Sequence, residues 1–383
     1  MSTAPVETLV DQLGAEGGGS RTLRSVVIVH DYLNQRGGAE KVVLEMSNIW
    51  PEAPIYTSLY RPDSTFAEFR ERDIRTSFLD RLPVDRGFRN LFPIYPAAFR
   101  SLGELAGNIV VASSSGWSHI ARVARGGMHV VYCHTPARWL YRADYLNAGG
   151  RRSRRQEAIR PVASAFRRID RRAARRADLY IANSRAVQRL IRSSYGIDAP
   201  VVHPPVDIDR FSPRPRGDRL LVISRLLPYK RVDLVVSAAT RLRIGLDVVG
   251  DGPMLNELRE IAGADVMFHR SASDATVAEL MEGCRAVCVA GEEDFGIVAV
   301  EAQAAGKPVV AYGRGGALET VEEHLTGVFF REQTVDSLVA AITASEGLDT
   351  PAEVIAERAR RFGVASFRQN LVAAILARQE QAV

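Results

Sequence analysis

Cysteine is scarce in this chain of 383 residues: Cys133, Cys284 and Cys288 are too few for a disulfide framework and lack zinc-ligand neighbours. We therefore expect buried thiols in a reducing compartment. Apolar runs of about 18 residues are also missing, so no membrane-spanning helix is predicted. Residues 1–24 contain acids and a Gly-rich stretch but no apolar core, which predicts a flexible extension and not a secretory signal. These absences predict a cytoplasmic protein.

Cofactor and metal signatures are lacking too. No G-x-G-x-x-G follows a predicted strand, which argues against a dinucleotide dehydrogenase. Asp207 and Asp209 form a D-x-D, but they lie in a Pro-rich stretch, where turn and capping roles are the simpler explanation. We predict no metal and no cofactor.

Acidic residues are rare in one segment. Residues 151–176 contain eleven arginines against Glu157 and Asp170, a local charge of +9 in a chain of net charge +5, so the rest carries −4. On a helix, Arg167, Arg168, Arg171, Arg172, Arg175 and Arg176 would make one face strongly cationic. A solvated helix face is one interpretation, and an anionic partner surface is the other.

Short β-rich runs alternate with helical patterns along the whole chain, which predicts an α/β fold with parallel sheets covered on both faces. The expected strands are 25–29, 108–112, 129–133, 178–182, 220–223, 245–249, 266–268, 286–289 and 308–311. Pro and Asp interrupt the alternation at 204–209, where we place a linker. We expect two doubly wound domains, 25–205 and 206–360, with ligands bound in a crevice at the strand ends. Residues 361–383 are expected to form a helix that packs back on the N-terminal domain.

The junction after the strand 286–289 is rich in acids. Glu293 lies in the loop, a helix begins near Phe295 or Gly296, and Glu301 follows nearly two turns later. A helix N-terminus offers unpaired backbone N–H groups to an anion, and carboxylates can accept hydrogen bonds from sugar hydroxyls. N-capping alone would explain one acid, but not both glutamates.

The junction after the strand 220–223 is rich in cations. Arg225, Lys230 and Arg231 follow that strand closely. A solvated charge cluster is the plain alternative. Because the acid-rich junction belongs to the same domain, we favour a diphosphate as the group that these cations hold.

Together these stretches resemble glycosyltransferase family 4, the retaining transferases of GT-B fold. The resemblance lies in the turn Val249–Pro253 (V-G-D-G-P) and in Glu293 and Glu301, which flank seven residues including F-G-I-V. It covers nearly the whole chain from Val26 onward, with Ser224 where a glycine often precedes the arginine. It implies two facing Rossmann-like domains with the active site in the cleft between them.

The resemblance implies a role for each matching donor-site residue. Glu301 would hold the nucleotide ribose and Glu293 the sugar hydroxyls, while Arg225 and Lys230 would bind the diphosphate and stabilise the leaving group. The backbone near Phe295, Gly296 and Ile297 would complete these contacts, and that near Phe268 and His269 would contact the base.

In the N-terminal domain, Gly37 and Gly38 follow the first strand. A tight turn is the simpler interpretation, but by resemblance this loop faces the donor. His134 ends the strand 129–133 and, by resemblance, hydrogen-bonds the transferred sugar without acting as a nucleophile. Arg138 and Trp139 either frame an acceptor or pack in the core.

The sequence resembles bacterial mannosyltransferases of cell-envelope glycan assembly in the stretches 134–139 and 291–295. This favours GDP-mannose as donor and a lipid-linked or glycan acceptor, with UDP-hexose still open. The arginine-rich stretch, and a second one at 86–95 with interspersed aromatics, suggest peripheral binding to anionic lipid. Nucleic acid is not expected, because aromatics are not interleaved with the arginine run. The alternatives are a nucleotide-sugar epimerase and a membrane-binding scaffold.

Overall fold

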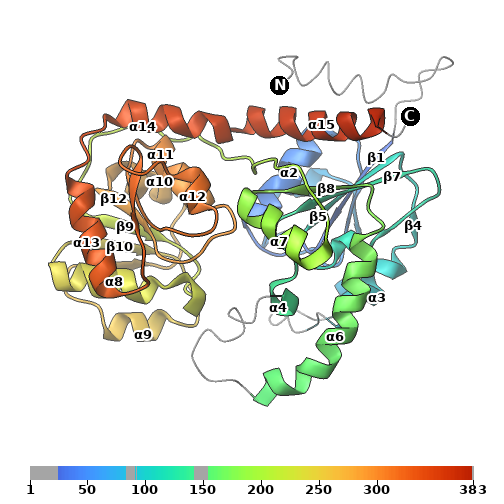
Figure 1. Cartoon of the computed structure of the whole chain (residues 1–383), viewed down its shortest axis with the longest axis horizontal. Helices are drawn as coiled ribbons and strands as arrows, with labels where there is room; N and C mark the ends of the chain where they lie inside the picture. Colours follow the sequence, from blue (N-terminus) through green and yellow to red (C-terminus); the bar gives the residue numbers. More distant parts are fainter. Residues whose placement is uncertain (1–24, 83–90, 92, 142–153, 382–383) are drawn as a thin grey trace. The chain divides into compact units, whose positions relative to one another are not determined.

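The structure is a computed structural model that describes residues 25–82, 91, 93–141 and 154–381 (Figure 1). The expected extension at 1–24 lies outside these residues, as does most of the stretch 86–95. Among the described residues, no helix combines the length and the apolar character needed to cross a bilayer.

Contacts divide the chain into two units. Unit 1 comprises Met1–Pro205 with Ala365–Val383, and unit 2 comprises Val206–Val364. The chain therefore leaves unit 1 at the predicted Pro-rich linker and returns to it with its last helix.

Unit 1 is built on a parallel sheet whose strands lie in the order β3-β2-β1-β5-β7-β8. Its strands are β1 (Val26–His30), β2 (Ile55–Thr57), β3 (Ile74–Thr76), β5 (Ile109–Ser114), β7 (Met128–Cys133) and β8 (Leu179–Ala182). A separate pair consists of β4 (Glu104–Leu105) and β6 (Arg122–Val123). The central strands are almost wholly apolar because helices cover both faces.

Two groups of helices cover the two faces of this sheet. One core contains α2 (Gly38–Ile49) and the C-terminal helix α15 (Val364–Glu380), which contributes Phe367, Leu371 and Ile375 at four-residue spacing. The opposite core contains α3 (Tyr95–Ser101), α4 (Arg138–Tyr141), α6 (Arg154–Ala174) and α7 (Arg185–Tyr195). Three short 3₁₀ helices cover residues Ala67–Glu71 (η1), Phe78–Arg81 (η2) and Ser118–Ile120 (η4).

Unit 2 repeats this plan with the strand order β11-β10-β9-β12-β13-β14, again all parallel. Its strands are β9 (Leu220–Ile223), β10 (Leu246–Val249), β11 (Val266–His269), β12 (Ala286–Val289), β13 (Val309–Tyr312) and β14 (Gly327–Phe330). Its helices are η5 (Pro228–Lys230), α8 (Val232–Leu242), α9 (Leu255–Glu260), α10 (Asp274–Gly283), α11 (Ile297–Ala304), α12 (Ala317–Thr320), α13 (Val335–Glu346), α14 (Ala352–Ala359) and η6 (Arg360–Phe362).

The predicted α/β class with two doubly wound parallel sheets is confirmed, and all nine expected strands form within a residue or two of their predicted bounds. The structure adds β2, β3 and β14 to the two large sheets and the separate pair β4 and β6, none of which the sequence analysis predicted. In each all-parallel sheet the strand order reverses once: successive strands are added on one side and then on the other. We call this point the reversal of the sheet, and it lies between β1 and β5 in unit 1 and between β9 and β12 in unit 2. Ligands of such sheets bind at the carboxyl ends of the strands beside this reversal.

Candidate functional site

The reversal in unit 2 brings the two predicted junctions together. The loop after β9 carries the cations, and the loop after β12 carries the acids. Lys230 Nζ donates to both carboxylate oxygens of Glu293, at 2.6 and 2.8 Å, and both side chains are mostly buried. Two residues 63 positions apart are thus joined in one charge pair at the strand ends.

The other cations of this loop differ in exposure and partners. Arg225 is exposed, and its guanidinium contacts the Tyr229 hydroxyl at 3.3 Å. Arg231, whose backbone is in the left-handed conformation, pairs with Asp233 at the start of α8. Arg225 of this loop therefore faces solvent, Lys230 pairs with Glu293, and Arg231 pairs with an acid in the first turn of α8.

A third loop, which the sequence analysis did not single out, forms backbone contacts with Glu293. It follows β13, where Gly316 N donates to Glu293 O at 2.8 Å and Gly315 forms a backbone bridge with Glu293. A Cβ on Gly316 would lie 2.4 Å from the Phe295 backbone, so only glycine fits this approach. The glycine pair in the sequence was the available signal.

Helix α11 begins at this acid-rich loop. Its N-cap, Gly296, has a φ of 94°, which favours glycine, and no side chain caps the helix. Its first N–H groups are therefore available to an anion. Glu301 lies on α11 and is 7% exposed. The Phe295 ring packs edge-on against Phe362 in the core, so a donor contact by Phe295 would have to use its backbone.

The predicted base-contacting residues lie farther along the sheet. Phe268 and His269 end the edge strand β11, which β10 and β9 separate from β12. His269 Nε2 lies 2.8 Å from Asp247, and the Arg259 guanidinium lies over the Phe268 ring. Both side chains thus have partners within unit 2, and the His269 carbonyl accepts a hydrogen bond from Gly250 N at 3.0 Å.

In unit 1, Gly37 caps α2 and Gly38 opens it. A Cβ on Gly37 would lie 2.6 Å from a carboxylate oxygen of Glu40, whose side chain is buried beneath the turn. A side chain at position 37 would therefore displace the carboxylate of Glu40. Neither glycine has a left-handed φ.

His134 follows β7 and is almost fully buried. Its Nε2 lies 2.8 Å from Ser113 Oγ, and Ser113 also contacts His30. Burial, reinforced by the neighbouring His30, lowers the pKa of His134 to about 3, so this imidazole is neutral at physiological pH.

Asp31, next to His30, is a buried acid whose role the sequence analysis missed. Its carboxylate accepts hydrogen bonds from the backbone N–H groups of Ser115, Trp117 and Ser118, at 2.6 to 2.8 Å. These bonds hold the loop after β5 against the end of β1, beside the reversal of the sheet.

Trp139 packs with Trp117 and Phe166, at ring-centroid distances of 5.9 and 6.0 Å. This favours the core interpretation of Trp139. The three cysteines are buried and free, and burial raises the pKa of both Cys284 and Cys288 to about 12. Asp207 and Asp209 are separated by Ile208 in the first turn of unit 2, and the described residues contain no cluster of three potential metal ligands.

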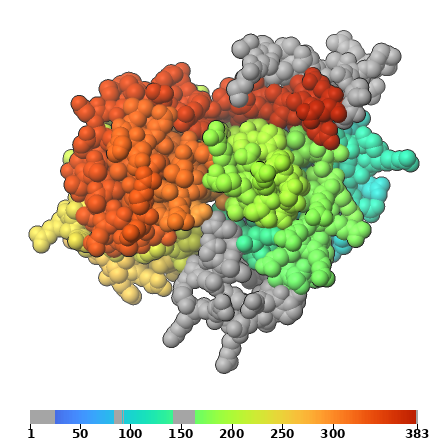
Figure 2. Space-filling model, viewed as in Figure 1, coloured from blue at the N-terminus to red at the C-terminus, as the bar shows by residue number. Residues whose placement is uncertain are grey.

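The arginine-rich segment is a helix from Arg154 onward. Arg167, Arg168, Arg171 and Arg172 are exposed on α6, and Arg175 and Arg176 are exposed directly after its end. Arg185, Arg189 and Arg192 are exposed on the adjacent α7. Both helices lie at the surface, in green and yellow-green in Figure 2. Arg167 and Arg171 also bond the Leu140 and Ser194 carbonyls. The buried Asp170 contacts His119 and Tyr141, which fixes the inner side of α6. We call the exposed arginines of α6, of the turn directly after it and of α7 the basic face.

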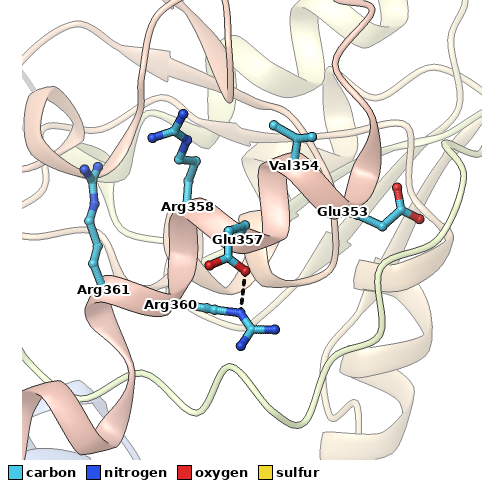
Figure 3. Close-up of a pocket in the computed structure, with 6 residues that line it drawn as sticks. All are labelled: Glu353, Val354, Glu357, Arg358, Arg360 and Arg361. Atoms are coloured by element: carbon cyan, nitrogen blue, oxygen red, sulfur yellow. Dashed lines mark ion pairs between the residues drawn. The ribbon is translucent and has the colours of Figure 1, made fainter.

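A hollow beside α14 contains none of the predicted site residues. Its lining is Glu353, Val354, Glu357, Arg358, Arg360 and Arg361 (Figure 3). Arg360 pairs with Glu357, while Arg358 and Arg361 approach Glu322. The charges of this surface hollow are thus largely compensated within unit 2.

Solved structures share this architecture. HepE of Anabaena, crystallised with UDP and glucose, matches with a TM-score of 0.69 and 21% identity, over 92% of this chain and 99% of that one. Sucrose-phosphate synthase from Thermosynechococcus elongatus matches with a TM-score of 0.69 and 18% identity, over 94% and 100%. These likenesses confirm the GT-B fold with its two Rossmann-like halves.

Curated relatives cover less of the chain. A GDP-mannose-dependent alpha-(1-6)-phosphatidylinositol monomannoside mannosyltransferase of Mycolicibacterium smegmatis is 34% identical over 216 residues, 48% of this chain and 56% of that protein. A D-inositol 3-phosphate glycosyltransferase of Geodermatophilus obscurus is 35% identical over 208 residues, 44% of this chain and 45% of that protein. The chain thus spans about half the length of the curated relatives it matches.

Family models account for both units. Residues 36–210 match the model described as Glycosyltransferase Family 4, and residues 207–362 match that described as Glycosyl transferases group 1. The matches meet at the linker and leave only the first 35 residues and the last 21 uncovered. The chain therefore belongs to glycosyltransferase family 4.

Proposed function

We propose that this protein is a retaining glycosyltransferase that moves a hexose, mannose by preference, from a nucleotide diphosphate sugar to a lipid-linked or cell-envelope glycan acceptor. The observation that carries this proposal is the pairing of Lys230 with Glu293 at the sheet reversal, beside the uncapped N-terminus of α11. A cation, a carboxylate and free backbone N–H groups are the groups that a sugar diphosphate requires.

The pairing also suggests how the site changes when the donor binds. Without donor, Lys230 and Glu293 neutralise each other in a mostly buried position. The donor diphosphate then offers Lys230 a second anionic partner, and its sugar offers Glu293 hydroxyl donors. Arg225, which is exposed at the same loop, adds positive charge next to the leaving diphosphate. Glu301 on α11 would bind the ribose, and Gly37, Gly38 and His134 would contact the sugar from unit 1.

The names of the similar proteins suggest candidates for the donor and the acceptor. The relative from Mycolicibacterium smegmatis is named as GDP-mannose-dependent, which supports GDP-mannose, while HepE was crystallised with UDP-glucose, which keeps UDP-hexose as the second candidate. Both curated relatives act on inositol-containing acceptors by name. A phosphoinositide acceptor is therefore the first to test.

A panel of labelled nucleotide sugars, each with and without a phosphoinositide acceptor, tests the function directly. We expect transfer or slow hydrolysis with GDP-mannose, and a product that keeps the anomeric configuration of the donor. Epimerisation without release of the nucleotide would instead identify an epimerase. Binding to lipid without turnover of any donor would identify a scaffold.

We expect activity to be independent of added divalent metal. Arg225, Lys230 and the α11 N-terminus would neutralise the diphosphate without an ion. The measurement is the initial rate in EDTA against the rate with added magnesium or manganese. Complete loss of activity in EDTA, restored by manganese, would contradict this expectation.

We also propose that the basic face docks on anionic lipid. Each basic residue near such a surface adds about 1 kcal/mol, and salt screens the attraction with a Debye length of about 10 Å at 0.1 M. Exposed apolar side chains would suit the same role: Phe78 and Leu82 precede the arginine- and aromatic-containing stretch 86–95, and Ile94 lies within it.

Vesicle binding should therefore need anionic lipid and weaken steeply with salt. Replacing Arg168, Arg172, Arg175 and Arg176 with Gln should weaken it further, because these arginines are exposed and, within the described part of the chain, do not bond neighbouring carbonyls as Arg167 and Arg171 do. A matched control replaces Arg241, Arg270, Arg331 and Arg360 of unit 2, which removes the same charge. Co-sedimentation with neutral and anionic vesicles measures the effect. Equal binding to both vesicle types, or none at low salt, would leave the basic face as a solvated surface.

A further inference from the structure

Behind His134, the core of unit 1 contains a chain of hydrogen-bonding side chains. His134 Nε2 lies 2.8 Å from Ser113 Oγ. Ser113 Oγ and the Ser113 carbonyl oxygen each lie 3.1 Å from His30 Nδ1. Ser113 and His30 are at most 1% exposed, so bulk solvent does not reach them. The proton positions must therefore be consistent within this group.

The Ser113 carbonyl fixes the first proton. A carbonyl oxygen only accepts, so His30 Nδ1 at 3.1 Å must carry a hydrogen, since an unprotonated nitrogen there would place two lone pairs against each other. This holds in either charge state of His30. Its other nitrogen, Nε2, faces a carboxylate oxygen of Glu40 at 3.8 Å, and protonation there leaves Nδ1–H in place.

The second proton follows from the first. With His30 Nδ1–H directed at Ser113, the serine hydroxyl is left to donate its own hydrogen. Among the described residues, its remaining partner is His134 Nε2. If His134 Nε2 carried the hydrogen instead, the buried hydroxyl would lack an acceptor. The arrangement that satisfies the Ser113 hydroxyl and both imidazole contacts to Ser113 has Nε2 of His134 accepting and Nδ1 protonated.

We propose that Ser113 and His30 are positioning residues that hold His134 as the Nδ1–H tautomer, so that the transferred sugar meets a fixed hydrogen-bond donor. This inference rests on the proposed function for the identity of the sugar. The tautomer of His134 depends only on contacts within the protein and can be measured without substrate. The lowered pKa of His134 agrees with an imidazole that stays neutral.

The first test needs no substrate. Long-range ¹H–¹⁵N spectra of protein labelled at histidine, with the His134 signals assigned from their loss in a His134→Asn variant, report which ring nitrogen is protonated. We expect protonated Nδ1 and unprotonated Nε2 on His134 from pH 5 to 9. A protonated Nε2 would overturn the proposal, whatever the enzyme transfers.

The second test compares two adjacent serines. Ser113→Ala removes the hydroxyl that bonds His134, while Ser114→Ala removes an equally buried hydroxyl that bonds His119. For hydrolysis of the donor, we expect Ser113→Ala to lower kcat by about 10-fold to 100-fold with little change in KM, and Ser114→Ala to stay within about twofold of the unmodified protein. Equal losses would reduce Ser113 to a packing residue.

The third test replaces His30 with two amides of different reach. The Asn amide nitrogen can take the place of Nδ1 and donate to the Ser113 carbonyl, whereas Gln places its amide nearer the position of Nε2. We expect His30→Asn to keep the His134 tautomer and His30→Gln to lose it. If both variants keep the His134 tautomer, His30 does not position His134. If the unmodified protein turns over no nucleotide sugar, the proposed function fails, and the spectra still decide the tautomer.

Discussion

Glu293→Ala is expected to reduce turnover of the donor by about 100-fold or more, because carboxylate contacts to a reacting sugar are stronger in the transition state. The substitution also leaves Lys230 without its partner at 2.6 Å, so that Lys230 is free to hold the diphosphate more tightly. We therefore expect kcat to fall while the affinity for the free nucleoside diphosphate is kept or increased. Steady-state kinetics and calorimetric titration with the nucleotide measure the two effects.

Glu292→Ala is the matched control, because it removes the preceding acid of the same loop and leaves the two bonds from Lys230 to Glu293 in place. Circular dichroism and the thermal midpoint show that each variant is folded. Nearly unchanged kcat/KM in folded Glu293→Ala protein would refute the role of Glu293. A weaker affinity for the diphosphate would instead show that the pair orders Lys230 for binding.

Asp31→Ala is expected to destabilise unit 1 by about 3 kcal/mol or more, since hydrogen bonds to charged groups contribute about 1.5–3 kcal/mol each and three backbone donors lose their acceptor. For a unit of this size, such a loss lowers Tm by about 6–12 °C. Differential scanning calorimetry should show the unit 1 transition shifted, with the unit 2 transition in place.

Asp73→Ala is the control for this prediction. It removes an acid of the same unit that is half exposed and paired with Arg75, and such surface pairs contribute about 0–1 kcal/mol. Asp31→Asn keeps one carbonyl oxygen and should fall between the two. If Asp31→Ala melts like Asp73→Ala, the three bonds do not hold the loop after β5.

The sequence predicted the parts of the fold that follow from local pattern. Strands whose residues are mostly buried, such as 109–112 and 220–223, are continuous apolar runs, and these were located to within a residue or two. The strands β2 and β3 were missed, because three residues of edge or near-edge strand carry too little periodic signal. The strand order, and with it the position of each sheet reversal, depends on long-range pairing that no local pattern contains.

The candidate site divides in the same way. Glu293, Lys230 and Gly296 stand in recognisable motifs, so their place at strand ends was predictable. Their contacts were not: the Lys230–Glu293 pair, the support from Gly316 and the burial of the Phe295 ring arise from loops of three different βα units. Ser113 and Asp31 carry no motif at all. Their roles depend on the register of β1 with β5, which places His30 opposite Ser113.

The return of α15 to unit 1 has a consequence for how the chain is made. The face of the unit 1 sheet that receives Phe367, Leu371 and Ile375 is formed by residues synthesised before unit 2, whereas α15 is synthesised after unit 2. At about 5–20 residues per second, synthesis from Pro205 to Ile375 takes about 9–34 s. During that interval unit 2 can fold as it emerges, while the apolar face of unit 1 that α15 later covers stays exposed. A nascent chain of this protein is therefore a natural client for chaperones that bind apolar surface, and translation speed over the second half of the message should affect its yield.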